Sequence, residues 1–271
     1  MEHRDDKIQF EFGIACDVGR KRKGEPNQDS AEVILPTLEE PWHPPLLVVA
    51  DGLGKYVGGS LASRIVVDTF RQQFKQAEHP ADYPELLLKC VHASHETIRA
   101  EGLKDTHLAL MGSTVVAVTL DEQKLYLLNI GDSRAYLIHA TKMTQISHDQ
   151  SWVAEQVRAG ILTEREARTN PNRNRLMMAI TAKRTEIEPF STEVKLEPMD
   201  RVLLCSDGLW GVVPESLIGA AARELPPQGA ADKLVALANN SSGPDNISVI
   251  IARRADFHKD AREASLDDTN P

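Results

Sequence analysis

The 271-residue chain contains little cysteine, and its cysteines are poorly placed for cross-linking. Cys16, Cys90 and Cys205 are odd in number, lie far apart and form no CxxC pair. A disulfide framework or a thiolate zinc site is therefore not expected, and a reducing compartment suits the sequence best.

Long apolar runs are also missing. No uninterrupted apolar stretch reaches the roughly 18 residues that predict a membrane-spanning helix. The first residues, MEHRDDKIQF, are charged and lack the apolar centre of a signal peptide. We expect a cytoplasmic protein that does not enter a membrane.

An excess of basic charge is absent as well. The net charge is -9, and the richest basic stretch, Arg20 to Lys23, is too short to be more than a local patch. Nucleic acid is therefore not an expected partner. The hydrophobic content of 41% and charged content of 26% are ordinary for a globular protein.

Strand and helix patterns are present, but they do not alternate one for one. Alternating or continuous apolar residues predict strands over Ile8–Cys16, Leu46–Ala50, Thr114–Leu120, Lys124–Ile130, Ala135–His139, Arg201–Ser206 and Ile247–Arg253. Helical spacing is found over Ser60–Phe74, Tyr83–Ala100, Ser216–Glu224 and Gly229–Asn239. Runs of strands with paired helices favour an α+β fold of sheets packed against helices over a doubly wound parallel sheet.

The same sequence patterns indicate the domain organisation. The three strands from Thr114 to His139 look like a meander with tight connections. Residues 147–188 turn polar and helical, and we expect them to form a mobile surface excursion. The sequence contains no interdomain linker, which favours a single domain over residues 1–255. Residues 256–271 are polar and acidic and are expected to be disordered.

Aspartates recur where predicted strands stop or begin. Asp51 directly follows an apolar strand in LLVVADGLG, and Asp207 does so in VLLCSDGLW. Asp132 lies in the turn between two strands, and Asp245 lies just ahead of the last one. A single Asp-Gly pair is commonly only a turn, but strand ends gather at the rim of packed sheets. The joint occurrence predicts that these acids meet there.

Such a cluster predicts a hard divalent cation. Carboxylates gathered without a compensating charge raise one another's pKa. Mg²⁺ and Mn²⁺ prefer oxygen ligands and relieve this repulsion, whereas zinc would call for His or Cys, which these turns lack. Glycine at position 52 allows a close backbone approach and offers its carbonyl as a further ligand.

Seven segments together resemble the metal-dependent type 2C protein phosphatases, particularly the compact bacterial members. In chain order they are DVGRKRKGEPNQDS, VVADGLG, MGSTVVAV, NIGDSRAYLI, SHDQSWV, CSDGLWGVV and GPDNISVII. Each motif alone is weak, but the ordered set is specific and covers nearly the whole chain, from about Ile8 to Arg253. The resemblance implies a sandwich of two antiparallel sheets flanked by pairs of helices.

The resemblance also implies a role for each matching acid. Asp51 would bridge two Mg²⁺ or Mn²⁺ ions, and the carbonyl of Gly52 would bind one of them. Asp207 and Asp245 would complete the other, and Asp29 would hold metal-bound water. The two metals would activate a water that attacks phosphorus directly, with no phosphoenzyme.

Two further positions carry expectations from the family. Asp132 in GDSR resembles the ligand of a third, looser metal. Arg22 is the best candidate for gripping the substrate phosphate. The loop after Arg22 is longer than usual in the family, so Lys23 or Arg20 remain alternatives.

Two motifs depart from the family pattern. The usual DGLGGH is DGLGKY here, so Tyr56 stands where the family has a histidine proposed as general acid. Tyrosine is a weaker acid, with an unperturbed pKa near ~10, so Tyr56 is either a weak donor or a packing residue. NRLMMAITAKRTEIEP occupies a segment that helps to shape the substrate groove, but it lacks the family's arginine and glycine.

The sequence therefore predicts a monomeric metal-dependent phosphatase acting on phosphoserine and phosphothreonine in proteins. Its partners would be phosphorylated proteins and a cognate kinase system. Two alternatives stay open. The chain could be a catalytically weak module that binds phosphoproteins, or a small-molecule phosphatase with the same metal centre.

Overall fold

The computed structural model describes residues 9–36, 43–54, 58–77, 82–121 and 123–255. The tail expected to be disordered, residues 256–271, lies outside these ranges. No helix within the described ranges is long and apolar enough to cross a membrane.

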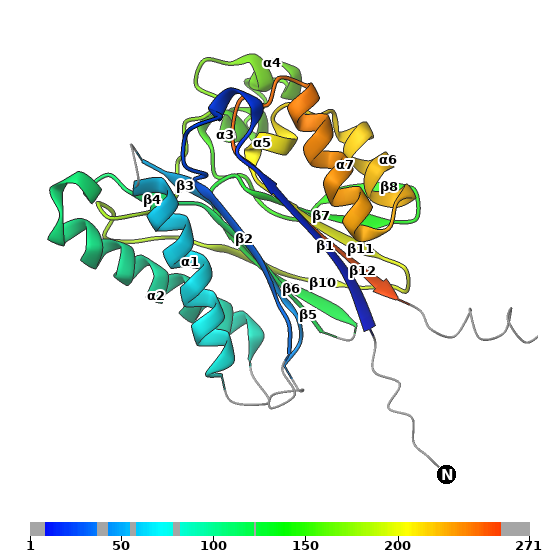
Figure 1. The fold of residues 1–271 in the computed structure, drawn as a ribbon, viewed down its shortest axis with the longest axis horizontal. Helices are drawn as coiled ribbons and strands as arrows, with labels where there is room; N and C mark the ends of the chain where they lie inside the picture. Colours follow the sequence, from blue (N-terminus) through cyan, green and yellow to red (C-terminus); the bar gives the residue numbers. More distant parts are fainter. Residues whose placement is uncertain (1–8, 37–42, 55–57, 78–81, 122, 256–271) are drawn as a thin grey trace, which may run out of the picture.

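Two antiparallel β-sheets form the centre of the molecule (Figure 1). The first sheet has the strand order β1 (Gln9–Asp17), β12 (Ile247–Ala255), β11 (Arg201–Cys205), β7 (Arg134–His139) and β8 (Lys142–Gln145). The second sheet has the order β10 (Phe190–Lys195), β6 (Lys124–Ile130), β5 (Val115–Leu120), β3 (Leu46–Leu53), β4 (Gly112–Ser113) and β9 (Ile180–Thr181), with β2 (Asp29–Ile34) also paired to β3. The expected α+β class with two antiparallel sheets is confirmed.

Helices cover the outer face of each sheet (Figure 1). The second sheet carries α1 (Gly58–Lys75) and α2 (Tyr83–Lys104), and the first carries α6 (Glu215–Glu224) and α7 (Pro227–Asn240). The remaining helical segments are short: η1 (Arg20–Arg22), η2 (Thr106–Leu108), α3 (Trp152–Arg158), α4 (Glu164–Thr169) and α5 (Asp207–Trp210). The layers therefore run helix, sheet, sheet, helix.

Residue alternation along the strands explains this layering. In β3, Leu46 and Val48 face α1 and α2, whereas Leu47 and Val49 face the other sheet. Successive side chains of a strand point to opposite faces, so a strand covered on both faces reads as a continuous apolar run. The expectation for Leu46–Ala50 is confirmed, since all five residues have no exposed surface.

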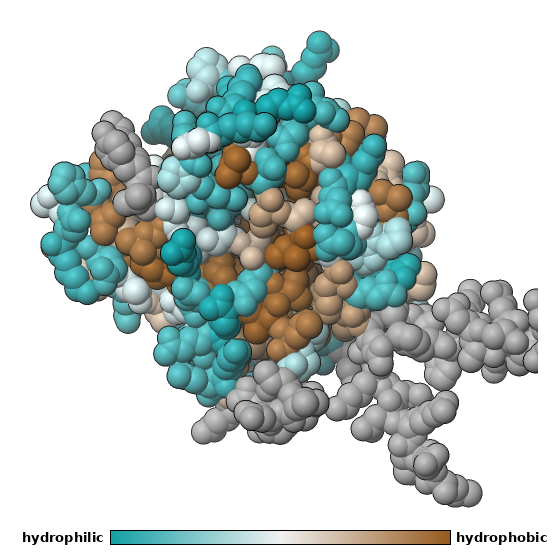
Figure 2. All heavy atoms as spheres, viewed as in Figure 1, coloured by the Kyte–Doolittle hydropathy of each residue, from teal (hydrophilic) through white to brown (hydrophobic). Residues whose placement is uncertain are grey.

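The core between the sheets reaches the open edge of the sandwich. Phe10 and Phe12 of β1 and Ala31 and Val33 of β2 pack against this core while remaining partly exposed. Figure 2 shows apolar surface between these two strands, with hydrophilic surface around it.

Two sequence expectations were wrong in detail. The segment from Thr114 to His139 is not a meander, because β5 and β6 pair in the second sheet whereas β7 belongs to the first. The turn that holds Asp132 therefore crosses from one sheet to the other. Asp51 lies inside β3 rather than directly after it, because Gly52 and Leu53 continue the strand by pairing with β4.

Candidate active site

Five aspartates from separate segments gather at one rim of the sandwich. The register of β2 and β3 sets Asp29 directly opposite Asp51. Asp207 opens α5 immediately beyond β11, and Asp245 lies just ahead of β12. The charges of Asp29, Asp207, Asp132 and Asp245 all act on Asp51. Like charges directly opposite each other in a sheet are destabilising, so this arrangement needs a compensating group.

Two glycines permit the close approach of these segments. A Cβ atom on Gly52 would lie 2.1 Å from the carbonyl oxygen of Gly59 and 2.5 Å from that of Gln28. A Cβ atom on Gly208 would lie 1.9 Å from the carbonyl oxygen of Asn246. The glycines after Asp51 and Asp207 are therefore required for packing at the rim, which goes beyond the needs of an ordinary turn.

Burial and mutual repulsion raise the pKa values of the clustered acids. Desolvation is the main cause at Asp29, whose pKa rises to about 7 although Ser206 donates a hydrogen bond to its carboxylate. At Asp207, desolvation and the charge of Asp245 raise the pKa to about 6. The pKa values of Asp51 and Asp132 are also raised well above the usual range, first by desolvation and then by neighbouring aspartates.

The carboxylates at this rim leave oxygen atoms unsatisfied. Oδ1 of Asp29 and Oδ1 of Asp207 are buried, and neither has a hydrogen-bond partner in the described part of the chain. Within the same ranges, no three His, Cys, Asp or Glu side chains already stand in the arrangement of a closed metal-binding group. Buried acceptors that lack donors suit a hard divalent cation, which prefers oxygen ligands. In its chemistry the donor set therefore fits Mg²⁺ or Mn²⁺.

Hydroxyl groups tie the two sheets together beneath these acids. Ser206 Oγ donates to Oδ2 of Asp29 at 2.7 Å, and it accepts from the backbone N–H of Ser248 at 3.0 Å. On the second sheet, the backbone N–H of Asp51 donates to Thr114 Oγ1 at 3.0 Å. Asp29 is thereby held from the opposite sheet, which fixes the spacing of the rim.

Arg22 lies beside the acidic cluster. Its Nη2 atom is 2.9 Å from both carboxylate oxygens of Asp245. Arg20 points elsewhere, since its Nη2 donates to Asn240 Oδ1 at 3.4 Å. Of Arg20, Arg22 and Lys23, Arg22 is the one that lines the adjacent cavity.

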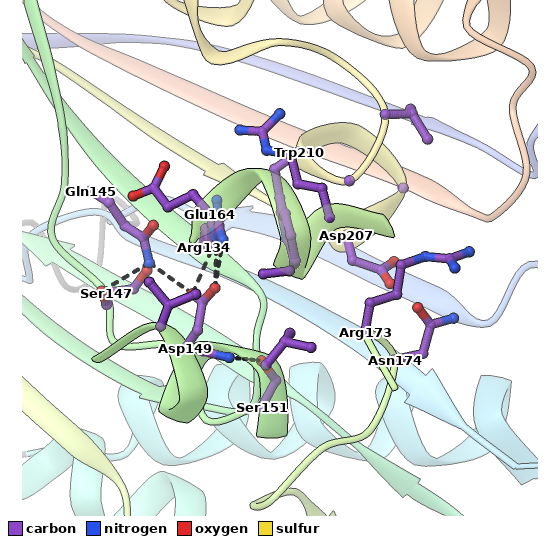
Figure 3. A pocket seen from close by; sticks show the side chains of 18 of the residues that line it. Arg134, Gln145, Ser147, Asp149, Ser151, Glu164, Arg173, Asn174, Asp207 and Trp210 are labelled. Carbon is purple, nitrogen blue, oxygen red and sulfur yellow. Dashed lines mark hydrogen bonds and ion pairs between the residues drawn. The ribbon is translucent and has the colours of Figure 1, made fainter. Parts of the chain in front are cut away.

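A cavity of about 520 Å³ opens next to the acids. Arg22, Asp207 and Asp245 form one side of it, and residues of the 147–188 excursion form another. Figure 3 shows Asp207 and Trp210 on α5 facing this space, with Asp149 and Ser151 across from them.

An ion pair at the base of the cavity links the excursion to the acidic rim. Arg134 donates from Nε and Nη2 to Oδ2 of Asp149 at 2.9 and 2.6 Å (Figure 3). Its guanidinium carbon lies 3.7 Å from the ring centroid of Trp210, whose Nε1 donates to the carbonyl of Asp132 at 3.0 Å. The arginine side chain is only 14% exposed, so this pair is a buried part of the cavity wall.

Sequence reasoning gave no role to several residues of this wall. Arg134, Asp149 and Trp210 lie within three of the family-like segments, in GDSR, SHDQS and SDGLW. Their place in these segments was the sequence signal that could have marked them as site residues. Arg168 and Arg173, which also line the cavity, lie in a polar stretch with no motif to mark them. Tyr56 lies outside the described residues.

Comparisons with known proteins agree with this architecture. The model of the protein phosphatase 2C family matches residues 18–237. The chain is 34% identical over 212 residues to the serine/threonine protein phosphatase PstP of Mycobacterium tuberculosis (strain ATCC 25618 / H37Rv), covering 78% of this chain and 41% of PstP. It is 31% identical to the serine/threonine phosphatase stp of Listeria monocytogenes (serovar 1/2a), covering 82% of this chain and 88% of that protein.

A solved structure gives the same result in three dimensions. The catalytic domain of PstP in complex with two manganese ions superposes with a TM-score of 0.80 and 30% identity, covering 92% of this chain and all of that one. The fold, the order of the motifs and the matched range agree throughout. The chain therefore belongs to the protein phosphatase 2C family.

Proposed function

We propose that this chain hydrolyses phosphoserine and phosphothreonine esters on proteins with the help of Mg²⁺ or Mn²⁺. The observation that carries the proposal is the placement of Asp29 opposite Asp51, with Asp207 beside them and buried carboxylate oxygens left without partners. Family membership supports the same reaction, although the chain spans only 41% of the length of PstP.

The proposed metal ligands are the clustered aspartates at the rim of the sandwich and one backbone carbonyl beside them. Asp51 would hold both ions, the carbonyl of Gly52 would be a ligand of one of them, and Asp207 and Asp245 would be ligands of the other. Asp29 would hold a metal-bound water. When bound, the metal pair supplies a water acidic enough to act as hydroxide at neutral pH.

Other side chains act on the substrate or prepare the site. Asp132, whose charge helps to raise the pKa of Asp51, is the proposed ligand of a third ion. Arg22 binds the phosphate of the substrate, because a guanidinium matches phosphate oxygens in pairs. In the structure Asp245 forms an ion pair with the same guanidinium at the cavity wall, so the arginine side chain is already oriented in the absence of substrate.

The wider setting is also a proposal. Residues 1–255 form one catalytic domain that acts as a monomer on phosphorylated proteins, opposite a cognate kinase system. The three cysteines are free thiols, which suits the reducing cytoplasm.

The test is hydrolysis of p-nitrophenyl phosphate and of a phosphoserine peptide with Mn²⁺, before and after chelation. We expect chelation to abolish both activities and Asp207→Asn to lower kcat/KM by at least about 10²-fold. Asp68→Asn, an exposed acid on α1, is the matched control and should change neither activity. Calorimetric titration with Mn²⁺ should show weaker metal binding by Asp207→Asn alone.

Two results would redirect the proposal. Tight Mn²⁺ binding without hydrolysis of any ester would indicate a phosphoprotein-binding module. Efficient hydrolysis of small phosphorylated metabolites, with phosphopeptides left intact, would indicate a small-molecule phosphatase.

A further inference from the structure

The wall of the cavity formed by the 147–188 excursion carries cationic side chains that the proposed reaction does not use. Arg158, Arg168 and Arg173 all line this side. Arg158 is engaged, since its Nη1 donates to the carbonyl oxygen of Asp149 at 3.0 Å. Arg168 and Arg173 are exposed and have no hydrogen-bond or ion-pair partner for their side chains in the described ranges.

Arg173 stands close to the acidic rim. Figure 3 shows its side chain rising from the loop alongside Asp207, with Asn174 next to it. Burial and Asp245 raise the pKa of Asp207, and the positive charges of Arg22 and Arg173 oppose this rise. Both arginines also line the same cavity as Asp207, so they face the place where the proposed phosphate ester binds.

The loop that presents Arg173 is held by two tight turns and by one hydrogen bond to α3. The backbone N–H of Arg173 donates to the carbonyl of Asn170 at 3.0 Å, and that of Arg175 donates to Asn172 at 3.0 Å. The carbonyl of Arg175 accepts from the N–H of Trp152 at the start of α3, at 2.8 Å. These turns direct Arg173 toward the cavity without the cost of ordering a free loop.

The space available exceeds what one phosphate ester needs. A cavity of about 520 Å³ falls in the range that encloses a drug-sized ligand. Arg22, which the proposed phosphate ester would occupy, and Arg134 already form ion pairs with Asp245 and Asp149. Among the arginines that line the cavity, Arg168 and Arg173 on the excursion side are therefore the ones whose side chains have no partner in the part of the chain that the structure describes.

We propose that Arg173, together with Arg168, forms a second anion subsite that selects phosphopeptides carrying a further acidic group near the phosphorylated residue. The proposal rests on the phosphatase activity proposed above and adds a substrate class to it. The second group is a carboxylate or another phosphate, since guanidinium groups bind both through paired hydrogen bonds.

The experiment compares peptides that share one phosphoserine and differ only in flanking residues. The flanks are neutral, carry two glutamates, carry a second phosphoserine, or carry two lysines. We expect kcat/KM to exceed that of the neutral peptide by about 3-fold for the glutamate peptide and by about 10-fold for the doubly phosphorylated one. The glutamate and second-phosphate arms identify which source of anion the subsite prefers.

The matched variants are Arg173→Gln, Arg168→Gln and Arg165→Gln. Arg165 is on α4, as Arg168 is, but it is exposed and does not line the cavity. We expect the ratio of kcat/KM for an acidic peptide to kcat/KM for the neutral peptide to fall toward 1 in Arg173→Gln and to persist in Arg165→Gln. An unchanged preference in Arg173→Gln, an equal loss in Arg165→Gln, or no acidic preference in the parent protein would overturn the proposal.

Peptide binding measured by fluorescence anisotropy in chelator separates this proposal from the proposed reaction. An acidic preference in binding that Arg173→Gln removes would support the subsite even if no peptide were hydrolysed. Hydrolysis without any preference would leave the reaction standing and refute the subsite. The preference should also weaken between about 0.05 and 0.3 M salt, because exposed charges are screened.

Discussion

The acidic rim should make the metal-free protein unstable at neutral pH, and removal of one acid should stabilise it. Asp207 has a usual pKa of 3.8, which the fold raises to about 6. When folding raises the pKa of a carboxyl group, the group contributes fully to the free energy of unfolding at any pH below its unfolded-state pKa. This contribution is lost as the pH rises through the folded-state pKa. Asp29 acts in the same direction, with a folded pKa of about 7. Without metal, the free energy of unfolding should therefore fall between about pH 4 and pH 7.

The magnitude follows from the shift at Asp207. One pKa unit corresponds to about 1.4 kcal/mol, and Asp207 is only half-buried, so solvent reduces the full value. We expect Asp207→Asn to unfold with a free energy about 1–3 kcal/mol above that of the parent in chelator at pH 8. For a chain of this size that is a rise in Tm of roughly 2–10 °C. At pH 5 the difference should be smaller, because the parent carboxyl is then mostly protonated.

The assay is thermal and urea denaturation in chelator at pH 5 and pH 8, repeated with Mn²⁺. His95 and His148 have pKa values lowered by burial, so they add a stabilising slope with rising pH. The same slope is present in both proteins and cancels in the comparison. With Mn²⁺ the parent should gain stability and Asp207→Asn should gain much less. A variant that is no more stable than the parent in chelator at pH 8 would refute the reasoning.

Three further predictions concern neighbouring parts of the site. Arg22→Met should lower kcat/KM on phosphopeptides by about 10²-fold, because the phosphate loses its guanidinium. Arg134→Met should reduce the free energy of unfolding by about 3–5 kcal/mol, because it leaves Asp149 buried at 7% exposure without its partner. Gly208→Ala should destabilise the fold by about 2–4 kcal/mol in urea denaturation, because its Cβ atom would lie 1.9 Å from the carbonyl of Asn246.

Each of these predictions has a control and a contradicting result. Arg20→Met, which changes an arginine outside the cavity, should keep its kcat/KM, and equal losses in both variants would remove the special role of Arg22. Lys124→Met breaks an exposed ion pair to Glu193 and should leave the free energy of unfolding nearly unchanged. If Arg134→Met behaved the same way, the buried pair would contribute little. Gly160→Ala has open space around its Cβ, although its φ of +70° adds strain, so it should cost less than Gly208→Ala.

Much of the fold could be predicted because its long elements have clear periodicity. The apolar run of β3 and the helical spacing of α1 and α2 appear in the sequence within a few residues of their observed bounds. The strands β2 and β10 were not predicted. In β10 all six residues are only half-buried or exposed, so few apolar side chains mark it. The assignment of β7 to the other sheet was missed because a tight turn at Asp132 looks local in the sequence.

Some of the site residues could also be predicted from the sequence, because they stand in a recognisable local pattern. Asp51, Asp207 and Asp245 stand next to glycine or asparagine beside apolar runs, and this pattern is visible without coordinates. Contacts between distant segments were not visible. Neither the hydrogen bond from Ser206 to Asp29 nor the pairing of Arg134 with Asp149 has a sequence signature, because each depends on how two sheets and a surface segment come together.

We propose that acids from both sheets hold a pair of divalent ions at one rim of the sandwich. Anomalous diffraction from crystals grown with Mn²⁺ tests it most directly. The account predicts two manganese peaks in contact with Asp51, one of them shared with Asp207 and Asp245. Manganese bound elsewhere, with these three side chains touching no metal, would contradict it.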